Sequence, residues 1–324
     1  MRMEVNMLKF SVGYQLTKSS DFIQKLIEYK ARIYEVYFSW GNFPNGRNNQ
    51  IKRADMLPWE AQNKQMEDLK RLSDAGIELN LLFNANCYGS DSQSREFFTR
   101  IGDTVDYIKS NYGLASVTTT SPLIAKFIKN NFENLHIRAS VNMEVGSIEG
   151  MKYISEYFDS FYMKRELNRD FDTIKKLHRW CEDNGKELYL LANSGCLNNC
   201  SVHNFHDNLV AHENEISKMD NAYDFRGICK EFLKKEENYV ALIENTNFIR
   251  LEDIYKYEPY FKAAKLATRV NPRPVRILES YIKGSYSGNI LELLEPAHNI
   301  YPYIVENGNP LKLKKLDTDI AFLE

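Results

Sequence analysis

The segment LANSGCLNNCSVHNFHDN, residues 191–208, carries two thiols and two imidazoles close together in the chain. Three residues separate Cys196 from Cys200, and His203 and His206 follow shortly after. Side chains of these types bind metal ions or iron–sulfur clusters, form redox pairs, or join a nucleophile to its general base. A polar loop without chemistry is the remaining interpretation.

The other cysteines extend this set. Cys87 lies in LLFNANCYGS and Cys229 in FRGICKEFL, whereas Cys181 lies on the apolar stripe of a predicted helix and is expected to face the core. Four thiolates from separate loops are the ordinary ligands of a 4Fe–4S cluster. The candidate cluster ligands are therefore Cys87, Cys196, Cys200 and Cys229.

Zinc is the alternative to a cluster. Four thiolates, or two thiolates with His203 and His206, would satisfy tetrahedral zinc. Structural zinc sites usually bring two close pairs of ligands, however, and the chain contains one close pair of cysteines. A third interpretation is that the free cysteines pack as small apolar side chains. An odd number of cysteines argues against a disulfide framework.

Apolar runs rich in β-branched and aromatic residues alternate with amphipathic stretches along the chain. The predicted strands are residues 10–16, 33–38, 77–83, 114–119, 135–141, 160–164, 187–192 and 261–266. The predicted helices are residues 19–29, 58–76, 122–131, 147–157 and 168–185. Pro58 near a first helical turn and Gly76 or Gly185 just past a helix end are typical boundary residues.

Eight strands separated by helices predict parallel β/α units, because parallel neighbours need a helical crossover. Their total length fits a (β/α)8 TIM-barrel-like fold, which typically needs about 250 residues. A doubly wound sheet is the competitor, but no glycine-rich phosphate turn favours it. Residues 193–249, after the seventh strand, far exceed a usual βα loop of about 2–6 residues. We therefore expect one domain over residues 1–324, with a cysteine-bearing insertion at 193–249.

The predicted barrel indicates where the candidate cysteines should lie. Loops that follow the strands build the active sites of such barrels. Cys87 follows the third predicted strand, and the other three candidate ligands follow the seventh. The four thiols are thus expected to converge on one face.

Composition and charge limit the partners and the cellular location that we expect for the protein. The net charge is −2, with 43% hydrophobic and 27% charged residues, which gives no strong nucleic-acid signature. No apolar run is long enough for a membrane span and no signal peptide is recognisable, so a cytoplasmic protein without membrane contact is expected.

Two stretches carry a family resemblance. MKRELNRDFDTIKKL at 163–177, followed by the cysteine segment, resembles the U32 family of collagenase-like peptidases. Within 248–289, Lys265 and Arg269 match the outer residues of that family's K-x-x-GR stretch, although its acidic-glycine centre is missing. The resemblance covers roughly residues 75–290 and is strongest over 163–208.

The resemblance implies a (β/α)8-like barrel that holds a 4Fe–4S cluster on four cysteines. Family members include oxygen-independent hydroxylases of ubiquinone synthesis, enzymes that hydroxylate RNA bases, and proteins named as peptidases. Cys196 and Cys200 match the family's Cys-x3-Cys pair. Cys87 and Cys229 have no motif match and are assigned from their predicted position.

Polar residues near the same face are candidates for catalysis. Glu166 is placed to act as acid or base and Arg169 to hold a carboxylate substrate, but this stretch also suits a helix cap. His203 and His206 are candidates for tuning the cluster or supplying protons. Arg47, after the second predicted strand, is similarly placed for binding.

The sequence favours an iron–sulfur enzyme, an oxygen-independent hydroxylase or related oxidoreductase acting on a small molecule or nucleobase. One alternative is a peptidase that uses Glu166 with His203 or His206 and holds structural zinc on its thiolates. Another is a non-catalytic, cluster-bearing scaffold that pairs with a related partner subunit.

Overall fold

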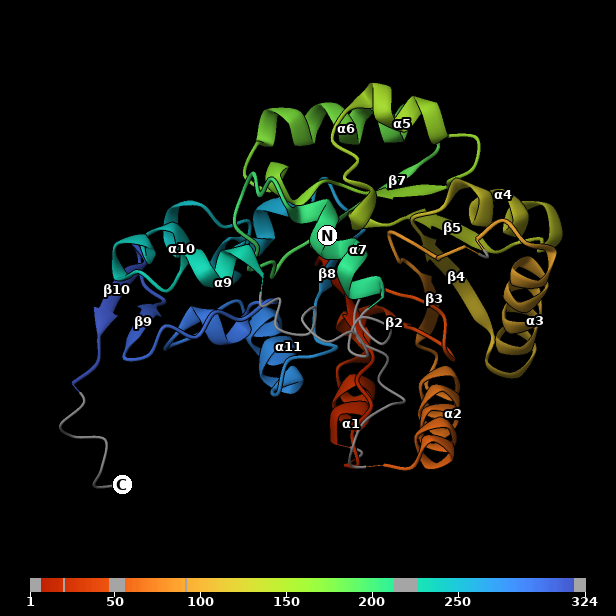
Figure 1. The fold of residues 1–324 in the computed structure, drawn as a ribbon, viewed down its shortest axis with the longest axis horizontal. Coiled ribbons are helices and arrows are strands. Elements are labelled where there is room, and N and C mark those ends of the chain that lie inside the picture. Colours follow the sequence, from red (N-terminus) through yellow and green to blue (C-terminus); the bar gives the residue numbers. More distant parts are fainter. Residues whose placement is uncertain (1–6, 20, 47–55, 91, 213–226, 318–324) are drawn as a thin grey trace, which may run out of the picture.

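A computed structural model gives the structure of residues 7–19, 21–46, 56–90, 92–212 and 227–317. Eight parallel strands form a closed barrel in chain order, with β1 paired to β8 (Figure 1). The strands are β1 (Lys9–Gly13), β2 (Ile33–Phe38), β3 (Glu78–Phe83), β4 (Leu114–Thr119), β5 (His136–Ala139), β6 (Ser160–Tyr162), β7 (Glu187–Leu191) and β8 (Ala263–Leu266). The predicted TIM-barrel-like fold is confirmed.

Helices surround the strands (Figure 1). Those between successive strands are α1 (Asp21–Glu28), α2 (Pro58–Asp74), α3 (Arg95–Tyr112), α4 (Pro122–Asn131), α5 (Ile148–Ile154) and α6 (Phe171–Asp183). Single turns of 3-10 helix add η1 (Lys30–Arg32), η3 (Val141–Met143) and η4 (Arg165–Leu167). The outward side chains of the strands, such as Val36 and Leu79, are fully buried beneath these helices and form the main core.

Helix α3 is an element that our sequence analysis did not predict. Its boundaries follow ordinary rules: the hydroxyl of Ser94 accepts a hydrogen bond from the Phe97 backbone N–H, and Gly113 ends the helix with a φ of 72°. Gly102 and several β-branched residues weaken the helical pattern of this stretch. Burial of its apolar stripe against the barrel compensates for that weak propensity.

The connection between β7 and β8 contains α7 (His203–Ala211), α9 (Ile228–Phe232), η5 (Glu236–Asn238), α10 (Ala241–Glu244) and η6 (Leu251–Tyr257). Residues 213–226 of the predicted insertion lie outside the described residues. After β8 come α11 (Pro274–Lys283), η7 (Ile290–Leu293) and the antiparallel pair β9 (Tyr303–Glu306) and β10 (Lys312–Lys315). In the described part of the chain, no helix has the length and apolar character needed to cross a membrane.

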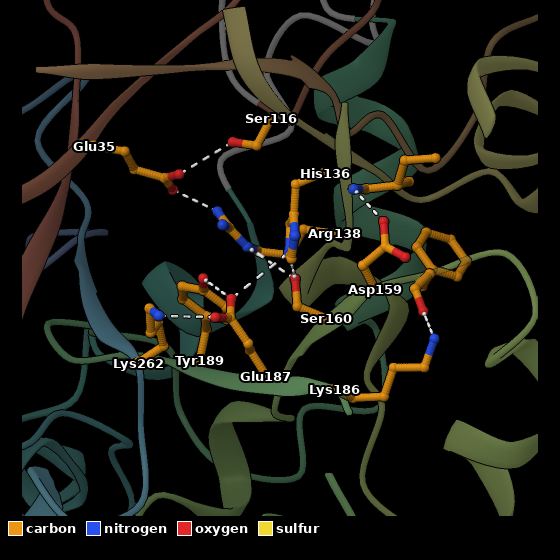
Figure 2. A network of polar contacts seen from close by, with 12 residues as sticks. Glu35, Ser116, His136, Arg138, Asp159, Ser160, Lys186, Glu187, Tyr189 and Lys262 are labelled. Atoms are coloured by element: carbon orange, nitrogen blue, oxygen red, sulfur yellow. Dashed lines mark hydrogen bonds and ion pairs between the residues drawn. The ribbon is translucent and has the colours of Figure 1, made fainter. Parts of the chain in front are cut away.

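The interior of the barrel is polar, which the apolar strands did not lead us to expect. The guanidinium of Arg138 and the carboxylate of Glu35 form an ion pair at 2.5 Å, and both side chains are essentially inaccessible to solvent. Asn80 donates further hydrogen bonds to Glu35. Ser116 also donates to Glu35, and Ser160 accepts a hydrogen bond from Arg138 Nε (Figure 2). Burial alone would lower the pKa of Arg138, but the charge and hydrogen bond of Glu35, together with the nearby Tyr189 and Tyr162, outweigh burial and raise that pKa.

Candidate functional site

The cysteine segment begins at a rigid corner after β7. The side chain of Asn193 is fully buried and donates hydrogen bonds to the carbonyls of Ala267 and Leu293, both at 2.9 Å. Its own oxygen accepts a hydrogen bond from the Ala267 backbone N–H at 2.7 Å. One amide side chain therefore joins the end of β7 to the end of β8 and to η7.

Gly195 continues this corner because nothing larger fits. A Cβ at residue 195 would lie 2.2 Å from the carbonyl oxygen of Pro296. The N–H of Gly195 donates to the Glu295 carbonyl, and its carbonyl accepts from His298 Nε2 at 2.9 Å. Burial lowers the pKa of His298, which favours the neutral ring with its proton on Nε2. The segment after η7 thus fixes the backbone next to Cys196.

The thiol of Cys229 lies within electrostatic range of two other thiols, those of Cys196 and Cys200. Burial raises the pKa of Cys229, and negative charge on Cys196 and on Cys200 raises it further. Cys196 and Cys200 flank a short turn before α7, while Cys229 is the second residue of α9. The Nη1 of Arg165 donates a hydrogen bond to Cys196 Sγ at 3.5 Å. Cys229 therefore lies within electrostatic range of Cys196 and Cys200, and Arg165 contacts Cys196; the binding of a cluster by these residues stays a prediction.

Cys87 lies on the loop after β3, as predicted, and its thiol is half-buried. Its Sγ accepts a hydrogen bond from the Gly89 backbone N–H at 3.5 Å. A Cβ at Gly89 would be 3.9 Å from the His212 ring, so this loop approaches the end of α7. A direct link between Cys87 and the other thiols stays a prediction.

His203 and Glu166 belong to one cluster of charged side chains, which we call the Glu144 cluster: Glu144, Lys164, Glu166, His203 and Asp207. His203 Nδ1 lies 2.6 Å from Glu144 Oε1, and His203 Nε2 lies 3.5 Å from Asp207 Oδ2. The ammonium of Lys164 is 4.0 Å from a carboxylate oxygen of Glu144 and equally far from one of Glu166. The cluster joins η3, η4 and α7.

The spacing of ligand atoms distinguishes this cluster from the thiols. Within the described ranges, Glu144, Glu166 and His203 form the one group of three or more histidine, cysteine or carboxylate side chains whose ligand atoms all lie within 4.8 Å. The sulfurs of Cys196, Cys200 and Cys229 therefore do not all lie within 4.8 Å of one another. Tetrahedral zinc, with bonds of about 2.3 Å to sulfur, requires sulfurs only about 4 Å apart.

The remaining predicted residues have structural contacts. The guanidinium of Arg169 donates to the carbonyl of Phe248 at 3.0 Å, and the side chain of Asp170 caps α6 by accepting from Thr173. His206 lies close to Gly227, with the ring 4.0 Å from where a Cβ would be. Substrate binding by Arg169 and proton transfer by His206 stay predictions.

Two further predictions concern Cys181 and Arg47. Cys181 is buried in the core, as predicted, and burial raises the pKa of its thiol to about 12. Arg47 lies outside the described residues.

Sequence reasoning missed Glu144, Lys164, Arg165, Asp207 and His298. Glu144 follows a predicted strand and Lys164 is the last residue of another, on the face where ligands bind, so their position along the chain was a usable signal. Asp207 is four residues after His203 on a helix, a spacing that places both side chains on one face. His298 carried no such signal, because its partner Gly195 is 103 residues away.

Comparison with known proteins finds similar structures but no similar sequences. No protein-family model matches the sequence, and no curated protein sequence matches it. The solved structure of the U32 peptidase Mk0906 aligns with a TM-score of 0.56 at 13% identity, over 80% of this chain and 92% of that chain. At this identity the alignment shows that the two proteins share a fold.

Other barrel enzymes align less well. A glycoside hydrolase family 5 mannosidase from Rhizomucor miehei gives a TM-score of 0.44 at 9% identity, over 90% of this chain and 95% of its own. Phosphoribosylanthranilate isomerase from Thermotoga maritima gives a TM-score of 0.40 at 14% identity, over 86% of this chain and 100% of that chain. Its closed barrel of eight parallel strands makes the chain a TIM-barrel-like protein. More particularly, its fold is like that of a U32 peptidase.

Proposed function

We propose that this protein is a U32-peptidase-like iron–sulfur enzyme, an oxygen-independent hydroxylase or related oxidoreductase acting on a small molecule or nucleobase. The electrostatic effect of Cys196 and Cys200 on Cys229, together with the hydrogen bond from Arg165 to Cys196, carries the proposal. The likeness to Mk0906 is consistent with it at the level of the fold.

The donor set fits an iron–sulfur cluster better than a single zinc ion. Three thiols that do not all lie within 4.8 Å of one another, with Cys229 in electrostatic range of the other two, suit a group of several irons, whose ligands bind different atoms. Cys87 is the candidate fourth ligand, on a loop that approaches the end of α7. A bound cluster would supply one-electron chemistry at this face.

The chain's own residues prepare the site. The Arg165 guanidinium donates to Cys196 Sγ and stabilises negative charge on that sulfur. The corner built by Asn193 and Gly195 fixes the approach of the cysteine segment. Glu166, next to Arg165 in the chain, and His203, three residues after Cys200, would serve as acid–base groups.

The test is the iron and zinc content of protein purified without oxygen, together with its ultraviolet–visible spectrum. We expect about four irons per chain and a broad absorbance near ~400 nm, both lost in Cys196→Ala and in Cys229→Ala. Cys181→Ala is the matched control, because that thiol is buried in the core. Colourless protein with one zinc per chain, or with neither metal, would overturn the proposal.

A second candidate function is hydrolysis by Glu166 and His203, which the notably close packing of the Glu144 cluster favours. Peptide cleavage of casein that disappears in Glu166→Gln and persists in Cys196→Ala would support this function instead. A related partner subunit that purifies in equal amount would favour the scaffold alternative.

A further inference from the structure

We infer that Glu144, Glu166 and His203 bind a divalent metal ion of the first transition row, separate from any group held by the cysteines. The inference goes beyond the iron–sulfur proposal and does not depend on it. Two carboxylate oxygens and one imidazole nitrogen lie within 4.8 Å of one another in this cluster. Bonds of about 2.0–2.2 Å to one ion would bring such ligand atoms to about 3–4 Å apart, a small adjustment.

Unsatisfied buried atoms support an ion at this position. Glu166 Oε2, His203 Nε2 and Asp207 Oδ2 are each buried and have no hydrogen-bond partner. Asp207 is only 8% exposed. Buried polar atoms normally find partners, because an unsatisfied group costs about 1–3 kcal/mol. A metal ion would supply the missing partner of Glu166 directly.

The two nitrogens of His203 give the second argument. Nδ1 points to Glu144 and Nε2 points to Asp207, so carboxylates face the ring on both sides. A metal-ligating histidine almost always donates its other ring N–H to a carboxylate or a carbonyl. With the ion on Nδ1, the Nε2 proton would face Asp207 Oδ2, and both atoms that lack partners would gain one.

Lys164 explains how the carboxylates coexist when no ion is bound. Its ammonium lies 4.0 Å from Glu144 Oε2 and 4.0 Å from Glu166 Oε2, so it partly neutralises both. The lysine side chain is about one-third exposed, and its flexible stem lets the ammonium move into solvent. The ion and the ammonium therefore compete for the same two carboxylates.

The ligand types indicate the ion and its role. Imidazole suits zinc, iron and nickel, while carboxylates also suit manganese. Three protein ligands leave coordination positions open for water or a substrate oxygen, as in catalytic metal sites. Arg165, which contacts Cys196, directly precedes Glu166 in the chain, so a Lewis acid would lie next to the proposed redox centre.

Manganese is the probe of choice, because Mn²⁺ prefers oxygen and nitrogen ligands to thiolates. Mn²⁺ binding to anaerobically purified, full-length protein is measured by electron paramagnetic resonance and calorimetry. We expect one Mn²⁺ per chain. Glu166→Gln and His203→Ala should weaken binding at least tenfold, and Asp207→Asn about 10–100-fold through the outer carboxylate. Lys164→Met should tighten it severalfold, since the competing cation is gone.

Controls separate this inference from the iron–sulfur proposal. Glu149→Gln removes one negative charge from an exposed position on α5 and should leave Mn²⁺ affinity unchanged. Cys196→Ala should retain Mn²⁺, and Glu166→Gln should retain iron. Absence of Mn²⁺ binding up to about 1 mM, or loss of binding in Cys196→Ala while Glu166→Gln binds normally, would overturn the inference.

Discussion

At the scale of single residues, the barrel interior contains a buried ion pair between Arg138 and Glu35. Arg138 reaches Glu35 across the barrel, and its guanidinium carbon lies 3.9 Å from the centre of the Tyr189 ring. The hydroxyl of Ser160 accepts a hydrogen bond from Arg138 (Figure 2). The side-chain amide of Asn80 donates one to Glu35. Removing one partner of the ion pair would destabilise the fold, because the charge of the other partner would stay buried without compensation.

We therefore predict that Arg138→Met destabilises the protein by about 3–5 kcal/mol, as does Glu35→Leu. The double variant Glu35→Leu/Arg138→Met should be less destabilised than the sum of the two single variants, since no lone charge remains. Chemical denaturation of all four proteins gives the coupling free energy. Additive effects would mean that the pair is not energetically linked.

At the scale of elements, we predict that Gly195→Ala disturbs the cysteine segment. The new Cβ would meet the Pro296 carbonyl at 2.2 Å, so one of the two backbones must move, at a cost of about 1–3 kcal/mol. Thermal unfolding should occur at lower temperature and bound iron should fall. Gly102→Ala in α3 is the control, because its Cβ would have ordinary contact with Phe127 and alanine favours helix. Equal stability of the two variants would contradict the expectation.

The elements themselves were largely readable from the sequence. Residues 33–38 and 114–119 form strands with the predicted bounds, because alternating apolar residues and nearby turn signals coincide there. The predicted strand at 10–16 ends at Gly13, since the backbone after it turns into the loops of the upper face. Helix α3 was missed although Ser94 and Gly113 mark its ends. Gly102 interrupts its helical pattern.

Fewer contacts of the candidate site could be predicted from the sequence, because many of them join residues far apart in the chain. Cys196 and Cys200 lie three residues apart, so their proximity follows from the chain. The contact of His203 with Glu144 spans 59 residues and depends on how η3 and α7 meet above the barrel. Spacing along one sequence does not encode such a contact, and the fold class alone fixes only the face on which both residues lie.

At the scale of the whole molecule, the chain after β8 completes the site although the barrel is already closed. Leu293 accepts from Asn193, and His298 donates to Gly195, so η7 and the residues after it brace the cysteine segment. Tyr281 of α11 also donates to the carbonyl of Ile249, in the connection between β7 and β8. Helix α11, η7 and the residues after η7 thus stabilise the insertion from outside the barrel.

This arrangement predicts opposite outcomes for two truncations. A chain that stops after Gly288 keeps all eight barrel strands but loses six buried apolar residues: Ile290, Leu291, Leu293, Leu294, Ile300 and Val305. It should unfold at a much lower temperature and bind no iron, because the cysteine segment loses its brace. A chain that stops after Gly308 loses β10, whose residues are all exposed, and should keep its iron and most of its thermal stability. Full iron content in the shorter chain would mean that the barrel and insertion form the site unaided.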